Sequence, residues 1–170
     1  MGAALAGIYA GHHPVAGLAL VDQAPYIRPF ATMVQQVAPA LRSDNFRAAF
    51  EPIRQTIGVE LLPEPERTSI LAGQRIDQDL ILGYWDEMLR VTPDELQARI
   101  DLELKAISVP VLAVFGQTID AATREHLLGH LPSAEIVEWP GLGHMVHLME
   151  PERFARRLAE FANRCLPASP

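Results

Sequence analysis

The chain has 170 residues, of which 49% are hydrophobic and 21% charged, a composition typical of one ordinary globular domain. Its formal net charge of −7 argues against a nucleic acid or a membrane surface as a partner, because either would require a basic face. No apolar run approaches the roughly 20 residues of a membrane span, no basic segment marks a signal peptide, and the single Cys165 excludes an internal disulfide, so we expect a cytoplasmic protein.

The predicted elements alternate between helices and buried strands. Residues 1–10 (MGAALAGIYA) predict a short helix of small side chains. Continuous apolar runs at 15–21 and 109–115, and a weaker one at 135–139, predict parallel strands, because strands buried on both faces do not alternate in polarity. A closing amphipathic helix is predicted over 151–165. The alternation indicates an α/β fold with three parallel strands and flanking helices.

A long helical segment separates the first two strands. Residues 24–99 contain no strand-like run and predict a series of helices at 29–41, 43–57, 66–72, 77–90 and 93–106. The last of these has the clearest start, with Thr92 as N-cap, Pro93 at the first position and Glu95 closing a capping box. We interpret residues 24–99 as a helical cap inserted into a core that consists of residues 1–23 and 100–170.

The strongest functional motif is the turn Gly141-Leu142-Gly143-His144, which precedes an amphipathic helix. Two glycines allow a sharp turn and keep bulk away from the imidazole, so that one ring face stays accessible. This arrangement is typical of a histidine that transfers protons.

Two carboxylates are candidates to orient His144. Asp120 follows the second strand through Gly116, and loops at the carboxyl ends of strands carry catalytic groups in α/β sheets. The structural alternative for Asp120 is an N-cap of a helix over 121–129. Asp22, at the end of the first strand, is the rival acid, with a strand-terminal turn as its own alternative.

The order strand, helical insertion, strand–Gly–Asp, strand–Gly-X-Gly-His and helix resembles the C-terminal half of an α/β-hydrolase. The start Met1-Gly2-Ala3 looks like the residues that follow the serine of that family's nucleophile elbow. The resemblance implies that the Met1 amide belongs to the oxyanion hole and that the nucleophile would be the residue before Met1. No Gly-X-Ser-X-Gly turn surrounds any serine of the chain, namely Ser43, Ser69, Ser108, Ser133 or Ser169.

The resemblance implies hydrolysis of a small carboxylic ester or related acyl substrate by Ser-His-Asp chemistry, without a cofactor, and with the nucleophile missing from this chain. Tyr84, Trp85 and Met88 are candidates for an acyl pocket, with packing in a helical core as the favoured alternative. A different hypothesis is a catalytically inactive fragment that acts as an interaction module or is completed by a separate N-terminal chain. Self-association or binding of that chain would use the unpaired edge of the strand at 15–21.

No metal site is expected in this chain. His144 and His147 form an H-x-x-H pair, and His12 and His13 are adjacent, but neither pair is accompanied by a third ligand at a suitable spacing. Cys165 is interpreted as a small hydrophobic side chain of the closing helix.

Overall fold

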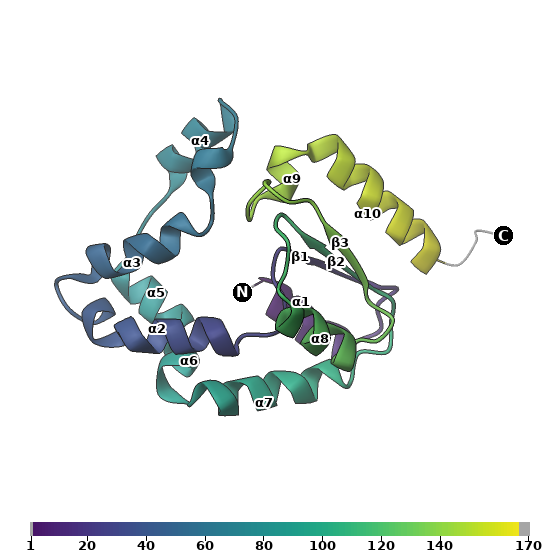
Figure 1. Ribbon diagram of the computed structural model, residues 1–170, viewed down its shortest axis with the longest axis horizontal. Coiled ribbons are helices and arrows are strands. Elements are labelled where there is room, and N and C mark those ends of the chain that lie inside the picture. Colours follow the sequence, from purple (N-terminus) through teal and green to yellow (C-terminus); the bar gives the residue numbers. More distant parts are fainter. Residues whose placement is uncertain (1, 167–170) are drawn as a thin grey trace. The chain divides into compact units, whose positions relative to one another are not determined.

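The computed structural model describes residues 2–166 and divides into two compact units (Figure 1). The first, here called the sheet unit, contains the chain up to Pro25 and from Ile100 onward. The second, here called the helical unit, is Tyr26–Arg99. In the part of the chain that the structure describes, no helix is both long and apolar enough to cross a membrane.

The sheet unit is built on a three-stranded parallel sheet in the order β1-β2-β3. The strands are β1 (Leu18–Val21), β2 (Val111–Phe115) and β3 (Glu135–Glu138). Because all three run in the same direction, their carboxyl ends meet at one edge of the sheet. The fold is therefore the α/β arrangement that the apolar runs predicted.

Strand β1 is shorter than the predicted range of 15–21. Its first ladder bond is donated by the Leu18 N–H to the Pro110 carbonyl, at 2.9 Å. In a parallel ladder the next bond upstream would be donated by the N–H of residue 110 to the carbonyl of Ala16. Pro110 has no N–H, so the pairing cannot extend further toward the N-terminus.

The sheet is covered on both faces, which explains the continuous apolar sequence of β2 (Figure 1). Alternate β2 residues enter two separate cores, and all five are buried. The core on one face lies beneath α1 (Gly2–His12) and α8 (Ala121–His130), and the core on the other lies beneath α9 (Val146–Met149) and α10 (Pro151–Cys165). The first core includes Leu18, Leu20, Val111, Ala113, Phe115 and Leu127, and the second includes Leu112, Val114, Val146 and Phe161.

The helical unit has its own core, made by Val34, Leu41, Phe46, Phe50 and Ile53. Its helices are α2 (Arg28–Leu41), α3 (Phe46–Gln55), the short 3-10 helix η1 (Val59–Leu61), α4 (Glu66–Gly73), α5 (Gln78–Tyr84) and α6 (Asp86–Arg90). Helix α7 (Pro93–Leu104) begins in this unit and ends in the sheet unit.

Two predictions about these helices have different outcomes. The capping box of α7 is confirmed, because the Glu95 N–H donates to Thr92 Oγ1 at 3.2 Å and the Thr92 N–H donates to Glu95 Oε2 at 2.9 Å. The single helix predicted over 77–90 is wrong, because the chain interrupts it at Trp85. The interruption follows Gly83, and a glycine inside a helix costs about 1 kcal/mol relative to alanine.

Candidate active site

His144 and Asp22 meet at the carboxyl edge of the sheet. The His144 Nδ1–H donates a hydrogen bond of 2.8 Å to Asp22 Oδ2. The Asp22 side chain is only 5% exposed, whereas that of His144 is 47% exposed. An ionised carboxylate can only accept hydrogen bonds, so the proton of the neutral imidazole belongs on Nδ1 and Nε2 is left as an acceptor. This is the tautomer and orientation that a general base requires.

The backbone at the end of β1 places the Asp22 carboxylate. The Asp22 N–H makes a ladder bond of 2.7 Å to the Val114 carbonyl, and the residue then turns into the left-handed region with φ of 47°. A short polar side chain makes Asp one of the few residues besides glycine that adopt this conformation readily. The turn buries the carboxyl group, and its Oδ1 accepts a second hydrogen bond, of 2.7 Å, from the Gly116 N–H.

Gly116 connects the acid to the histidine loop. Its N–H binds Asp22, while its carbonyl accepts hydrogen bonds from the N–H groups of Leu142, at 3.0 Å, and Gly143, at 3.2 Å. A Cβ at position 116 would lie 1.8 Å from the Gly143 carbonyl oxygen, so no side chain fits there. Gly141 and Gly143 have φ of 92° and 65°, which glycine adopts without the steric cost of a Cβ.

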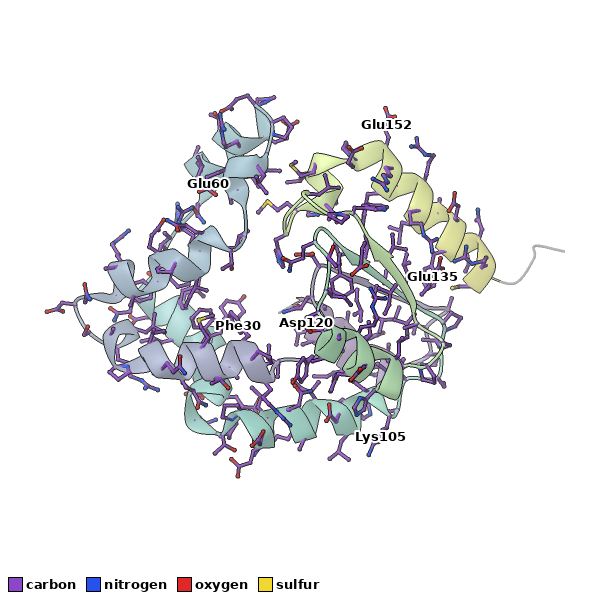
Figure 2. All side chains as sticks on the ribbon, in the orientation of Figure 1. Phe30, Glu60, Lys105, Asp120, Glu135 and Glu152 are labelled. Carbon is purple, nitrogen blue, oxygen red and sulfur yellow. The ribbon has the colours of Figure 1, made fainter. Side chains whose placement is uncertain are left out.

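The structure corrects the expected partner of His144. Asp120 does not bind the imidazole but caps α8, where its carboxylate accepts a 2.7 Å hydrogen bond from the Thr123 N–H. This hydrogen bond also lowers the pKa of the Asp120 carboxyl from its ordinary value of 3.8. Figure 2 labels Asp120 at the start of α8. The predicted pairing of His144 with Asp120 is therefore wrong, and in the structure His144 is hydrogen-bonded to Asp22, the rival candidate.

The capping role of Asp120 leads to a prediction about stability. Asp120→Ala should lower the melting temperature at pH 7, whereas Asp120→Asn should nearly preserve it, since Asn is an equally good N-cap. A lowered pKa in the folded state means that the carboxylate stabilises the protein above pH 3.8, and that this contribution is lost as pH falls through the lowered value. Thermal denaturation should therefore show that Asp120→Ala lowers the melting temperature less at pH 3 than at pH 7.

The other predicted site residues are described here within their own units. Met1, expected at the oxyanion hole, lies outside the described residues. Trp85 and Met88 pack against the core of the helical unit, with the Trp85 ring centroid 5.7 Å from that of Phe30, and Tyr84 is exposed. His147 is exposed, and its ring centroid lies 6.0 Å from that of Phe154.

No described serine or cysteine of the sheet unit lies at the carboxyl edge of the sheet. Ser108 and Ser133 precede β2 and β3 and therefore belong to the opposite edge. Cys165 packs beside Gly17, ahead of β1, in the core under α10, in keeping with its predicted role as a hydrophobic side chain. Ser43 and Ser69 belong to the helical unit.

One cluster was not foreseen from the sequence. Among residues 2–166, Asp101, His126 and His130 offer three potential metal-ligand atoms that lie within 4.8 Å of one another. The available signal was the H-x-x-x-H spacing in the predicted helix after Asp120, which places two imidazoles on one helical face. The third group comes from α7, and nothing in the local sequence pairs it with the histidines.

Known structures identify the fold. No family model and no curated protein matches the chain. It is similar to the crystal structure of E-2-(acetamidomethylene)succinate hydrolase, with a TM-score of 0.60 and 19% identity over 95% of this chain and 63% of that one. VinJ gives a TM-score of 0.60 and 15% identity, covering 96% and 63% of the two chains.

A proline iminopeptidase of Mycobacterium smegmatis is similar with a TM-score of 0.51 and 17% identity, covering 96% of this chain and 62% of that one. The chain thus spans less than two thirds of the length of each of these structures. It has the fold of the C-terminal portion of an α/β-hydrolase.

Proposed function

We propose that this chain supplies the acid–base part of a hydrolytic active site that cleaves small carboxylic esters or related acyl compounds. The observation that carries the proposal is the 2.8 Å hydrogen bond between a buried Asp22 carboxylate and a half-exposed His144. In this proposal His144 is the general base and then the general acid, and Asp22 fixes its tautomer and stabilises the imidazolium. The hydrolytic neighbours in the comparisons support the reaction class.

The proposed nucleophile is a serine directly before residue 1. Supporting this position, the Ala3 N–H donates a 3.1 Å hydrogen bond to the Gln23 side-chain carbonyl, one residue after Asp22. The first turn of α1 therefore lies at the same edge of the sheet as the Asp22–His144 pair. A helix N-terminus at this edge also favours developing negative charge, and the Met1 amide is the proposed oxyanion-hole donor.

The proposed reaction has two stages. The serine Oγ attacks the acyl carbon while His144 Nε2 takes its proton, and the carbonyl oxygen becomes an oxyanion. The imidazolium then protonates the leaving alcohol as the C–O bond breaks and the acyl-enzyme forms. In the second stage water attacks the acyl carbon while His144 takes its proton, which gives a second tetrahedral intermediate. The imidazolium then returns this proton to the serine Oγ as the bond between Oγ and the acyl carbon breaks and the acid is released.

An activity measurement tests this proposal. The chain would be expressed with and without the polypeptide encoded directly upstream of residue 1, then assayed with p-nitrophenyl esters and a fluorophosphonate probe. We expect labelling and hydrolysis only when the upstream polypeptide is present, with the label on its serine. A stop codon upstream, or labelling of a serine within residues 1–170, would contradict the proposal.

A second candidate function is supported by the open edge of β1. Within the described residues, β1 pairs only with β2. Leu5, Ile8 and Tyr9 of α1 are large and exposed. An unpaired strand edge is a template for pairing with another chain. We propose that this edge binds a β-strand of an N-terminal partner segment, and that the isolated chain associates with itself there instead.

A proline substitution can block this edge selectively. The Leu18 N–H donates to β2, and alternate residues of a strand donate to the same neighbour, so the Ala19 N–H points to the open edge. Ala19→Pro removes that donor without removing a bond to β2. We expect the wild-type chain to form oligomers in light scattering after size exclusion, and Ala19→Pro to reduce them.

Ala19→Ser keeps the N–H and serves as the matched control, which should associate like wild type. Far-ultraviolet circular dichroism of both variants verifies that the fold is retained. A wild-type chain that is monodisperse as a monomer and melts cooperatively would contradict the interaction at this edge.

A further inference from the structure

We propose that Asp101, His126 and His130 form a binding site for a divalent first-row transition metal ion, with Zn²⁺ as the ion to test. The two histidines are four residues apart on α8, so their rings lie on one face, with centroids 4.4 Å apart. Asp101, on α7, faces both of them: its Oδ1 lies 2.8 Å from His126 Nε2, and its Oδ2 lies 3.7 Å from His130 Nε2. All three residues belong to the sheet unit.

A hydrogen bond to the backbone orients His130 as a metal ligand. Its Nδ1–H donates to the backbone carbonyl of His126 at 3.0 Å. Metal-bound histidines usually donate a hydrogen bond from the N–H of their other ring nitrogen to a carbonyl or carboxylate, which fixes the ring and leaves a lone pair for the metal. In His130 that lone pair is on Nε2, the atom that faces the Asp101 carboxylate.

The spacing of the ligand atoms suits a small tetrahedral ion. Zn–N and Zn–O bonds of about 2.0–2.2 Å place two tetrahedral ligands about 3.4 Å apart. The two distances from Asp101 to the histidines, 2.8 Å and 3.7 Å, lie on either side of this value. All three ligand atoms lie within 4.8 Å of one another, so an ion that binds them all would draw the side chains closer together.

The chemistry and burial of the cluster agree with this ligand class. Two imidazoles and one carboxylate are the donor set of many zinc and other first-row metal sites, whereas Mg²⁺ and Ca²⁺ prefer oxygen ligands. The side chains are 26%, 12% and 22% exposed for Asp101, His126 and His130, so water can reach the site as a further ligand. A bound ion would join the end of α7 to α8, the helix that follows the Asp120 cap.

The chain provides a matched control for a simple ion pair. His12 Nε2 lies 2.6 Å from Glu103 Oε2, so a histidine of another helix pairs with a carboxylate of α7 there too. In contrast to the proposed site, no third ligand completes a cluster with this pair among the described residues. If any histidine–carboxylate pair bound metal, binding would be seen at the His12–Glu103 pair as well as at the proposed site. If three ligands are needed, binding would be seen only at the proposed site.

Titration with ZnCl₂ tests the proposal on the 170-residue chain. We expect isothermal titration calorimetry to detect one site, and zinc at 100 times its Kd to raise the melting temperature by roughly 5–10 °C. Loss of a residue that only hydrogen-bonds to a metal ligand weakens metal binding by about 10–100-fold. His130→Gln and Asp101→Asn each remove a proposed ligand, so each should weaken zinc binding by more than that. His12→Gln should bind like wild type. Absence of saturable binding by wild type, or binding that His12→Gln weakens and His130→Gln does not, would overturn the site.

A measurement on wild type alone covers the case in which a variant fails to fold. Co²⁺ is added to ¹⁵N-labelled protein, and its paramagnetic effects on the amide and imidazole signals locate the ion. The proposal requires the largest effects at Asp101, His126 and His130. Effects centred on His144 and His147, or on His12 and His13, would overturn it.

Discussion

Replacing His144 by alanine is expected to abolish most of the hydrolytic activity, with kcat falling by about 10⁶-fold in a form of the protein that carries its nucleophile. In the proposed mechanism this side chain transfers every proton, so no other group can replace it. The measurement is steady-state hydrolysis of a p-nitrophenyl ester. A change in KM alone would instead assign His144 to substrate binding.

Substitutions of the two candidate acids should have clearly different effects on kcat in the same assay. Asp22→Asn should lower kcat by about 10⁴-fold, because an amide in contact with Nδ1 favours the wrong tautomer and no longer stabilises the imidazolium. Asp120→Asn is the matched control, since Asp120 caps α8 and does not contact His144. Its kcat should remain within a few-fold of wild type. A large loss of kcat in Asp120→Asn together with a small one in Asp22→Asn would identify Asp120 as the catalytic acid instead.

Gly116→Ala is expected to cost about 3 kcal/mol or more of folding stability. The added Cβ would lie 1.8 Å from the Gly143 carbonyl oxygen and 2.8 Å from Val146 Cγ1. The Gly143 oxygen is a backbone atom, so it cannot rotate away as a side chain can. Relief of the clash must separate the histidine loop from β2 and break the hydrogen bonds to the Gly116 carbonyl. Urea denaturation of the 170-residue chain measures the loss.

Gly129→Ala is the control for this substitution. Gly129 lies in α8 of the same unit, and a Cβ there would meet nothing within 4 Å. Alanine should stabilise the helix by about 0.4–1 kcal/mol. Equal stability of Gly116→Ala and wild type would mean that the histidine loop is not packed against β2 as described.

The strands and the histidine loop could be predicted because their signals are local. The apolar run of β2 reports burial on both faces, and the glycines around His144 report a turn with positive φ. The shorter length of β1 could not be read from its own residues, because the limit is the missing N–H of Pro110 on the neighbouring strand. Local patterns therefore give the elements but not their pairing.

The carboxylate partner of His144 was predicted incorrectly for the same reason. Asp120 has strong local signals, a glycine before it and a helix after it, and these signals describe its capping role. The contact of Asp22 with His144 joins residues 122 positions apart in the chain, and it depends on the left-handed turn at Asp22 and on the order of the strands. The Asp101–His126–His130 cluster was missed because its carboxylate comes from a different helix.

The most direct test of the proposed active site is the tautomer of His144 in the 170-residue chain, measured by long-range ¹H–¹⁵N correlation of its imidazole in alkaline buffer. His144→Ala assigns the signal. The hydrogen bond to Asp22 predicts a protonated Nδ1 and an unprotonated Nε2, a pattern that Asp22→Asn disturbs and Asp120→Asn leaves unchanged. A protonated Nε2 in wild type, or a pattern that responds to Asp120→Asn and not to Asp22→Asn, would contradict the Asp22–His144 pair.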